Sequence, residues 1–292
     1  MKRILVTGST GLVGSRFIEL YPDSDLLHYP KEIELDITDP VSINALFSSF
    51  DFCAVVHFAA FTNVSEAEKQ RNDKKGECYV VNFEGTKNLV DAAKGKGIKF
   101  IYISTDMVFS GRPDNKGPYP ESSMPVLDSE ILNWYGYTKA LAESYVRENL
   151  PSSAYIVRIN NPVRVNFEAK LDYLHKILNL YESGNLYPLF TDQKIGLTFI
   201  DDVAVALTKI IQKDISPGTF HVSSSDVSSP YDIASYYLSK VFKKSIDLRG
   251  IKMSDEDKRR YPQYGGLLCE ESCKTLDLPQ RSIRDIVDKL VL

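Results

Sequence analysis

The chain has 292 residues and a formal net charge of −4 at neutral pH. This length suffices for one large domain with a smaller partner, and the mildly acidic balance argues against nucleic acid or an anionic membrane as the main partner. No apolar stretch approaches the roughly 20 residues that span a bilayer. Met1 leads directly into an apolar segment, which leaves no room for a signal peptide. We therefore expect a cytoplasmic protein.

The first distinctive feature is a glycine-rich run that follows a short apolar segment. Residues 4–6 (ILV) have the pattern of a strand buried in a parallel sheet, and TGSTGLVG follows at residues 7–14. Apolar residues then resume at helical spacing. Glycines allow a tight turn and let a pyrophosphate approach the main chain, and the helix that follows directs free N–H groups at the phosphates. This order of strand, turn and helix predicts a dinucleotide site.

Strands and helices alternate through the first half of the chain. Such alternation, with right-handed crossovers, predicts an α/β fold with a Rossmann-type doubly wound parallel sheet. We expect strands at residues 25–29, 52–60, 100–103 and 154–159, and helices at residues 41–50, 84–94 and 133–148.

The regular alternation of strands and helices ends after residue 161. Helical patterns at 167–181, 230–242 and 282–290 do not continue the alternation, whereas 198–213 and 218–223 resemble a further strand, helix and strand. We therefore expect two domains. Residues 1–162 and 201–226 would form the NAD(P)-binding Rossmann domain, and residues 163–200 and 227–292 a smaller, discontinuous α/β substrate domain.

The end of the second strand bears on the choice of cofactor. In many dinucleotide folds an acidic residue at this point holds the adenosine ribose. Here the chain reads His-Tyr-Pro-Lys at residues 28–31, with no carboxylate before Glu32. A lysine near the ribose favours a 2′-phosphate, so Lys31 favours NADP(H) over NAD(H). The alternative that Lys31 is a solvated loop residue stays open.

A tyrosine and a lysine form the candidate catalytic pair. Tyr135 and Lys139 are four residues apart on one predicted helix, so their side chains share a face. An ammonium beside a phenol stabilises the phenolate and lowers its pKa, so the pair can exchange a proton near neutral pH. The preceding strand ends in Ser-Thr-Asp at residues 104–106, where ligands bind in parallel sheets. Alternatively, Thr105 caps a turn and Asp106 bonds neighbouring amides.

The remaining reactive side chains suggest no metal site. Cys269 and Cys273 are four residues apart, but no histidine or further cysteine lies near enough in the sequence to complete a zinc set. We interpret them as core residues. His57 ends a predicted strand, where core packing is favoured over catalysis.

In the order of its motifs, the chain resembles the extended short-chain dehydrogenase/reductase superfamily, and most of all its dTDP-4-dehydrorhamnose reductases. The motifs span nearly the whole chain. They are LVTGSTGLVGS, LDITDP, VVHFAAFTNVSEAE, VNFEGTKNL, FIYISTDMVFSG, YGYTKALAE, VRINNP, TDQKIGLTFIDDVA, GTFHVSSS and RRYPQYGGL.

The resemblance implies a role for each matching position. Tyr135 would donate a proton to a substrate carbonyl oxygen, Thr105 would hydrogen-bond that oxygen, and Tyr135 and Lys139 would hold the nicotinamide ribose. The cofactor would be bound by Gly8, Thr10, Gly11, Leu12 and Val13 at the pyrophosphate, Asp36 and Ile37 at the adenine side, and Ala59, Ala60 and Thr62 in the middle. The substrate would be bound by Asp106, Met107 and Asn161.

The chain also departs from the reductases. Ser65 stands where they usually have Asp, Met107 where they usually have Tyr, and a few residues are inserted between Pro125 and Asn133. These departures leave the cofactor site intact and leave the sugar and its nucleotide open.

The predicted function is an NADP(H)-dependent reductase of a 4-keto nucleotide sugar, with a homodimer among the expected states. The alternatives are a nucleotide-sugar epimerase and a non-catalytic NADP-binding regulatory subunit, such as the β subunit of methionine adenosyltransferase.

Overall fold

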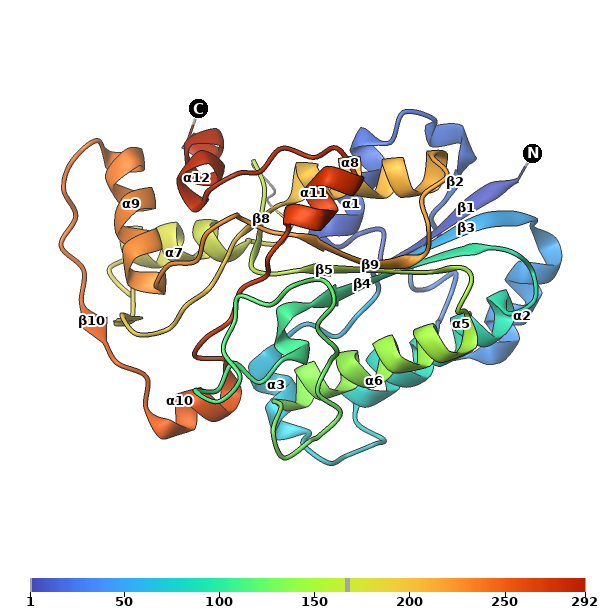
Figure 1. Cartoon of the computed structure of the whole chain (residues 1–292), viewed down its shortest axis with the longest axis horizontal. Helices are drawn as coiled ribbons and strands as arrows, with labels where there is room; N and C mark the ends of the chain where they lie inside the picture. Colours follow the sequence, from blue (N-terminus) through green and yellow to red (C-terminus); the bar gives the residue numbers. More distant parts are fainter. Residues whose placement is uncertain (1, 166–168, 292) are drawn as a thin grey trace.

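The computed structural model describes residues 2–165 and 169–291, which are built around one six-stranded sheet (Figure 1). The strand order is β2-β1-β3-β4-β5-β9, and every neighbouring pair is parallel. The order reverses beside β1, and ligands of such sheets bind outside the carboxyl ends at that point. The strands are β1 (Arg3–Thr7), β2 (Leu27–His28), β3 (Phe52–His57), β4 (Lys99–Thr105), β5 (Ala154–Ile159) and β9 (Gly218–Val222).

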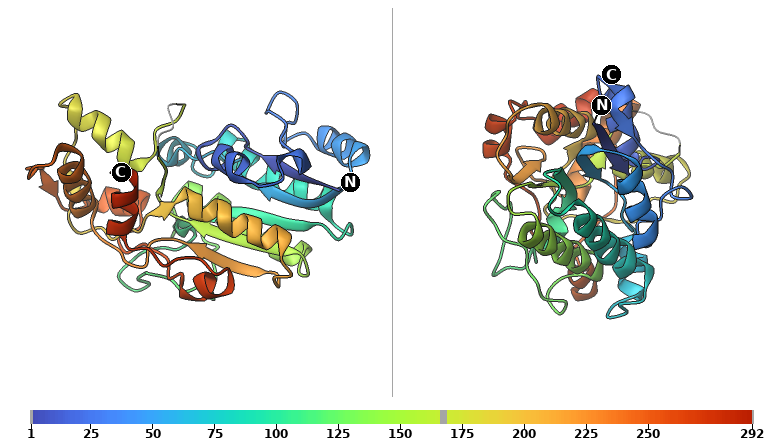
Figure 2. Two further views of the ribbon diagram at one scale, coloured as in Figure 1. Left: turned by 90° about the horizontal axis from the view of Figure 1, so that it is seen from above. Right: turned by 90° about the vertical axis from the view of Figure 1, so that its right-hand side faces the viewer.

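Helices cover both faces of the sheet, as Figures 1 and 2 show. Side chains alternate along each strand, so Ile4 and Val6 enter the core on one face and Leu5 the core on the other. This arrangement confirms the predicted doubly wound α/β fold. The first face carries α1 (Leu12–Leu20), α8 (Ile200–Gln212) and α11 (Glu270–Thr275), and the second carries α2 (Pro40–Ser49), α5 (Thr86–Ala93) and α6 (Trp134–Asn149).

The helix predicted at residues 84–94 is the end of a longer helical region. Glu77–Tyr79 (α4) leads into a π-helical turn at Val80–Gly85 (η2), which continues as α5. A separate helix, α3 (Val64–Lys69), precedes them. The π-helical turn interrupts the 3.6-residue period, so the apolar pattern predicted only the last part of this region.

The other helices and strands gather beyond the carboxyl ends of the sheet. Helices α7 (Tyr173–Glu182), α9 (Pro230–Phe242) and α12 (Ile283–Val291) contribute side chains to one core. The short parallel pairs are β6 (Pro162–Val163) with β8 (Thr198–Phe199) and β7 (Leu189–Phe190) with β10 (Gly250–Ile251). Of the remaining elements, η3 (Asp106–Val108) and α10 (Asp255–Arg260) lie on the same side, whereas η1 (Ser24–Leu26) directly precedes β2 at the amino edge of the sheet.

Helix α7 starts later than the sequence predicts. Asp172 caps it by accepting hydrogen bonds from the N–H groups of Leu174 and His175, so the helix begins at Tyr173. Leu171, which the predicted helix at 167–181 would include, precedes the observed helix and is 44% exposed. Residues 166–168 of the predicted helix lie outside the described residues.

The segment that contains α11 returns to the large sheet. Cys269, Cys273 and Leu276 are buried in the same core as Val203 of α8 and Phe220 of β9. The prediction that the two cysteines are core residues is confirmed.

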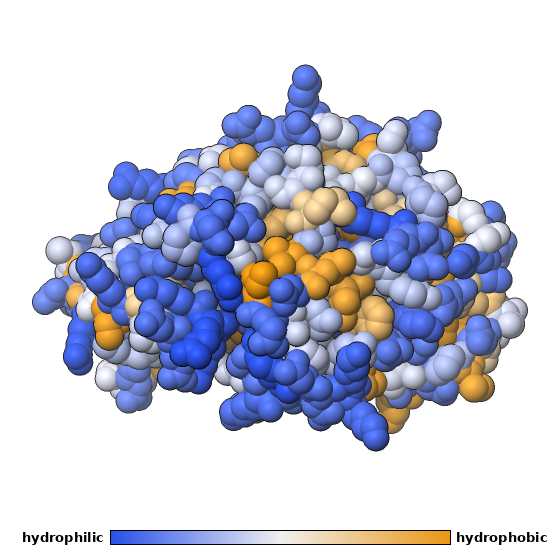
Figure 3. Space-filling model, turned by 60° about the horizontal axis from the view of Figure 1, so that its bottom comes forward, coloured by the Kyte–Doolittle hydropathy of each residue, from blue (hydrophilic) through white to orange (hydrophobic). Residues whose placement is uncertain are grey.

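The face that carries α3, α6 and α10 is mostly hydrophilic, with apolar side chains gathered near its middle (Figure 3). Within residues 2–165 and 169–291, no helix combines the length and the apolar composition needed to cross a membrane.

Candidate active site

A cleft of about 1040 Å³ opens at the carboxyl ends of the central strands. It begins at the glycine-rich turn after β1 and extends to the first turn of α6. Nearly all residues that the sequence nominated line this one cleft, although they are spread over residues 8–161. These residues are Gly8, Thr10, Gly11, Leu12, Val13, Asp36, Ile37, Ala59, Ala60, Thr62, Thr105, Asp106, Met107, Tyr135, Lys139 and Asn161.

The glycine-rich turn has the geometry of a phosphate cradle. Gly8 has φ of +68°, and a Cβ there would lie 2.6 Å from the main-chain nitrogen of Ala59. A Cβ on Gly14 would lie 2.4 Å from the carbonyl oxygen of Gly8. Gly11 precedes α1, and no side chain in the described part of the chain caps that helix. The turn therefore requires glycine, and the free N–H groups at the start of α1 fit a pyrophosphate.

The adenine side of the cleft differs in part from expectation. Pro30 and Glu32 line the wall, but Lys31 between them is exposed and is not part of the wall formed by the described residues. Asp36 lines the cleft and accepts hydrogen bonds from the N–H and the hydroxyl of Thr38.

The middle of the cleft is held by a residue that sequence reasoning missed. The Asn82 amide accepts a hydrogen bond from the N–H of Phe61 at 2.8 Å and donates to the Phe61 carbonyl at 3.1 Å. It also donates to the Thr138 hydroxyl on α6 at 3.1 Å. Asn82 thus ties the loop that carries Ala60 and Thr62 to α6. A polar residue on an otherwise apolar helix face was the signal available in the sequence.

His57 plays the structural role that the sequence favoured. It is 1% exposed, and its ring lies between the hydroxyls of Thr7 and Thr86 at 2.7 and 3.0 Å. Burial lowers its pKa to about 3, so the imidazole is neutral at physiological pH.

Tyr135 lies in the first turn of α6, at the inner end of the cleft. Helix α6 and η3 come close because Gly136 has no side chain: a Cβ there would lie 2.1 Å from the carbonyl oxygen of Met107. Burial raises the pKa of Tyr135, and Cys78 and Asp106 add to this effect, whereas the Thr105 hydroxyl opposes it. The expectation of a lowered Tyr135 pKa is therefore wrong for this structure.

The position of Lys139 explains that difference. Its Nζ donates to the Ile103 carbonyl at 2.7 Å and lies 4.0 Å from the centre of the Tyr102 ring. Burial lowers its pKa to about 7, while Glu143, one turn further along α6, opposes that shift. The Lys139 Nζ is thus directed at β4, and burial decides the direction of the Tyr135 pKa shift.

Thr105 and Asp106 continue from the end of β4. The Thr105 hydroxyl accepts a hydrogen bond from the Met107 N–H at 3.2 Å, which caps η3, and it faces the cleft. Asp106 is 6% exposed and accepts from the N–H of Gly266 at 3.3 Å. Burial raises its pKa to about 6.

Met107 and Asn161 complete the described wall near Tyr135. Met107 is half-buried, and its sulfur lies 3.8 Å from the amide nitrogen of Asn133. Asn161 has φ of 37° and donates to the Gly196 carbonyl at 3.0 Å. Asn160, which the sequence analysis did not nominate, also lines the wall. Ser65 lies near Tyr261, with their hydroxyl oxygens 3.3 Å apart.

A family model described as RmlD substrate binding domain matches residues 1–291 of the chain. The chain belongs to this family. This match, over almost the full length, confirms the resemblance that the sequence motifs indicated.

The chain is similar to proteins named as reductases and to a protein named as a subunit of methionine adenosyltransferase. A dTDP-4-keto-6-deoxy-D-glucose reductase from Streptomyces niveus is 28% identical over 236 residues, which are 80% of this chain and 76% of that protein. The methionine adenosyltransferase 2 subunit beta of Rattus norvegicus is 27% identical over 304 aligned positions, covering 96% of this chain and 84% of that protein.

Among solved structures, the fold is similar to that of a dTDP-4-dehydrorhamnose reductase from Bacillus anthracis in complex with NADP. The TM-score is 0.82 at 24% identity, with 99% of this chain and 98% of that chain covered. The predicted assignment to the NAD(P)-dependent oxidoreductases of the extended short-chain type is confirmed.

Proposed function

We propose that this protein reduces the 4-keto group of a nucleotide sugar of the dTDP-4-dehydrorhamnose type, with NADPH as the reductant. The observation that carries the proposal is the single cleft that joins the glycine-rich turn to Thr105, Tyr135 and Lys139. When bound, the nicotinamide supplies the hydride. The family and the reductase relatives support this reaction class.

The protein's own residues supply the proton and the orientation. Tyr135 donates its phenolic proton to the carbonyl oxygen as negative charge develops there, and Thr105 holds that oxygen. The raised pKa of Tyr135 keeps the phenol protonated, which suits a proton donor. Lys139 holds the nicotinamide ribose. Asp106, Met107 and Asn161 line the sugar side of the cleft.

We further propose that residues 163–200 and 227–292, apart from the segment around α11 that packs on the large sheet, form the part that covers the substrate. Lys170, Leu171 and Tyr173 line the cleft opposite the strand ends, and the Lys170 ammonium donates to the Thr62 hydroxyl at 3.2 Å. This contact brings the segment before α7 across the cleft from the loop after β3.

The preference for NADPH is a separate proposal. β2 ends at His28 without a carboxylate, so the usual acidic partner of a ribose is missing at that point among the described residues. The similar Bacillus anthracis structure contains NADP. The Glu32 carboxylate lines the wall and would repel a 2′-phosphate. Lys31, the residue before it, is exposed and is not part of the wall formed by the described residues.

We therefore expect tighter binding of NADPH than of NADH when both are titrated against the protein fluorescence. Glu32→Gln should increase the NADPH preference by removing a negative charge from the wall. Lys31→Gln should reduce the preference for NADPH, because it removes the nearest positive charge in the chain after β2. Equal affinities for the two cofactors would contradict the inference that the missing carboxylate at the end of β2 favours NADPH.

An activity assay tests the reaction class and separates it from dehydration. Elimination of water from a sugar needs an acid and a base at the strand end, and Met107 can neither take nor give a proton. We expect net oxidation of NADPH with a dTDP-4-keto-6-deoxy sugar, and no 4-keto product, detected by its alkaline absorbance, from dTDP-glucose. Formation of that product would refute the reductase proposal.

The relative named methionine adenosyltransferase 2 subunit beta favours a second candidate function, binding to a partner enzyme. NADPH binding without turnover of any 4-keto nucleotide sugar would favour that function. Interconversion of sugars without net NADPH oxidation would favour an epimerase.

A further inference from the structure

The start of α6 is held by a side chain from a different helix. Within α6, Asn133 provides the usual cap by accepting a hydrogen bond from the Gly136 N–H at 2.7 Å. The N–H of Trp134, directly before Tyr135, instead donates to Oε2 of Glu68 at 3.0 Å. Glu68 belongs to α3, which follows the cofactor loop after β3. A carboxylate beside a helix N-terminus also complements the helix dipole.

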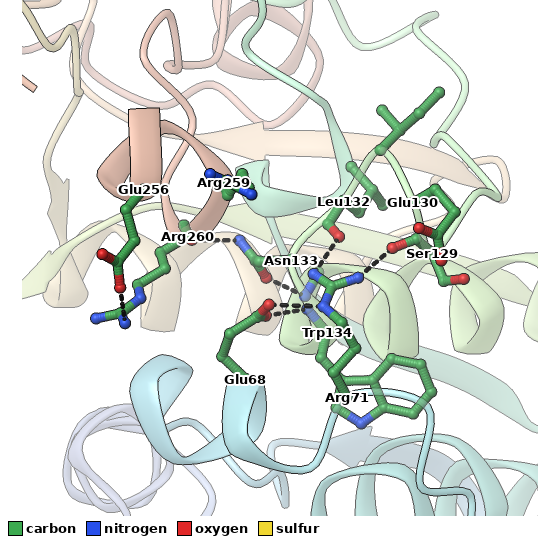
Figure 4. Close-up of polar contacts among 12 residues, drawn as sticks. Glu68, Arg71, Ser129, Glu130, Leu132, Asn133, Trp134, Glu256, Arg259 and Arg260 are labelled. Carbon is green, nitrogen blue, oxygen red and sulfur yellow. Dashed lines mark hydrogen bonds and ion pairs between the residues drawn. The ribbon is translucent and has the colours of Figure 1, made fainter. Parts of the chain in front are cut away.

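Glu68 is in turn fixed by Arg71. Its Oε1 accepts from Nε of Arg71 at 2.6 Å. The two Nη atoms of the same guanidinium donate to the main-chain carbonyls of Ser129 and Leu132 (Figure 4). Arg71 therefore joins α3 to the residues that lead into α6.

The residues before α6, 128–132, form a short turn in which the carbonyls of residues 129–132 all accept hydrogen bonds from arginine side chains. The N–H groups of Ile131 and Leu132 bond to the Asp128 carbonyl, and the Asp128 carboxylate accepts from the Glu130 N–H at 2.8 Å. Arg112 donates to the carbonyls of Glu130 and Ile131, each at 3.1 Å. With the two carbonyls held by Arg71, all four carbonyls of residues 129–132 accept from a guanidinium.

This turn, called the inserted turn below, lies where the sequence analysis expects an insertion relative to the reductases that the chain resembles. The turn ends at Leu132, which is 2% exposed, so its buried side chain holds the main chain in place directly before α6. Arg71 and Glu68 are 28% and 20% exposed at their side chains, compared with 71% and 48% for the neighbouring Lys69–Glu66 pair of α3. The partly buried pair is therefore a far better candidate for a rigid contact than the exposed one.

We propose that Glu68 and Arg71 are positioning residues that set the place of the Tyr135 phenol by fixing the inserted turn and the first N–H of α6. The inference rests on the proposed function, because it assigns these residues to the proton-donating step. Neither side chain lines the cleft formed by the described residues. Their effect reaches the reaction only through the main chain beside Tyr135. Displacement of a reacting group by about 1 Å can cost about 100-fold in rate.

Steady-state kinetics on Arg71→Ala test this proposal. We expect kcat to fall about 10- to 100-fold, with the affinity for NADPH unchanged, because the cofactor wall is untouched. Arg71→Lys should recover only part of the loss, since an ammonium cannot reproduce the planar fork that contacts one carboxylate and two carbonyls. Glu68→Gln should also lower kcat. Lys69→Ala, the matched control on α3, should keep wild-type kinetics.

A double variant distinguishes positioning from general destabilisation. If Arg71 acts through the Tyr135 phenol, Arg71→Ala should cost little further rate in a Tyr135→Phe background, because contributions that act as a unit are not additive. Losses that multiply in the double variant, or a wild-type kcat for Arg71→Ala and Glu68→Gln, would overturn the inference. In the latter case a slow Tyr135→Phe variant leaves the proposed function standing. Wild-type turnover of Tyr135→Phe itself would refute the proposed function together with the inference.

Discussion

Tyr135→Phe is expected to lower kcat about 10²- to 10⁴-fold, the usual range for the loss of a general acid. The phenyl ring keeps the shape and the burial of the side chain, so the fold should persist. Cofactor affinity should change little, because the substitution leaves the glycine-rich turn and the loop after β3, which both line the cleft, untouched. Stopped-flow or steady-state oxidation of NADPH, with fluorescence titration of the cofactor, measures both quantities.

The matched control is Tyr137→Phe on the same helix. Tyr137 packs against Trp134 with ring centres 5.4 Å apart and does not line the cleft formed by the described residues. Its loss of a hydroxyl should leave kcat near the wild-type value. If Tyr137→Phe were the slow variant and Tyr135→Phe the active one, the assignment of the proton donor would be refuted.

Gly14→Ala is expected to weaken cofactor binding about 10- to 100-fold, which corresponds to about 1.4–2.8 kcal/mol. In most helix interiors, alanine in place of glycine is stabilising by up to about 1 kcal/mol. Here the sign reverses, because the new Cβ would lie 2.4 Å from the carbonyl oxygen of Gly8. The main chain of the phosphate turn must then move away from α1.

Gly218→Ala provides the comparison for this variant. Gly218 begins β9, and no described atom apart from its chain neighbours lies within 4 Å of the position of its Cβ. It should bind NADPH as the wild type does. Unchanged NADPH affinity in Gly14→Ala would mean that the turn does not contact the pyrophosphate.

The sequence predicted the parts of the site that depend on local order. The glycine spacing from Gly8 to Gly14 is enough to predict the turn. Thr105 was predicted from its place at the end of a strand, and Tyr135 from its spacing to Lys139 on one helix. Such features need only short stretches of chain. The other nominations came from the resemblance to the reductases, and sixteen of the nominated residues line the cleft.

The sequence could not predict features that depend on tertiary contacts. The pKa direction of Tyr135 depends on burial, and the wall position of Glu32 rather than Lys31 depends on how the chain after β2 turns. The bond from Glu68 to the Trp134 N–H joins residues 66 positions apart. No spacing rule relates such residues.

Transfer of a labelled hydride tests the central claim most directly. The protein would be incubated with NADPH that carries deuterium at the transferable position and with dTDP-4-dehydrorhamnose, and the sugar product would be analysed by mass spectrometry and NMR. We predict one deuterium at C4 of the product and an equal amount of NADP⁺, with Tyr135→Phe slowing both. Retention of the deuterium on the cofactor while substrate and protein are mixed at saturating concentration would contradict the assignment as a reductase.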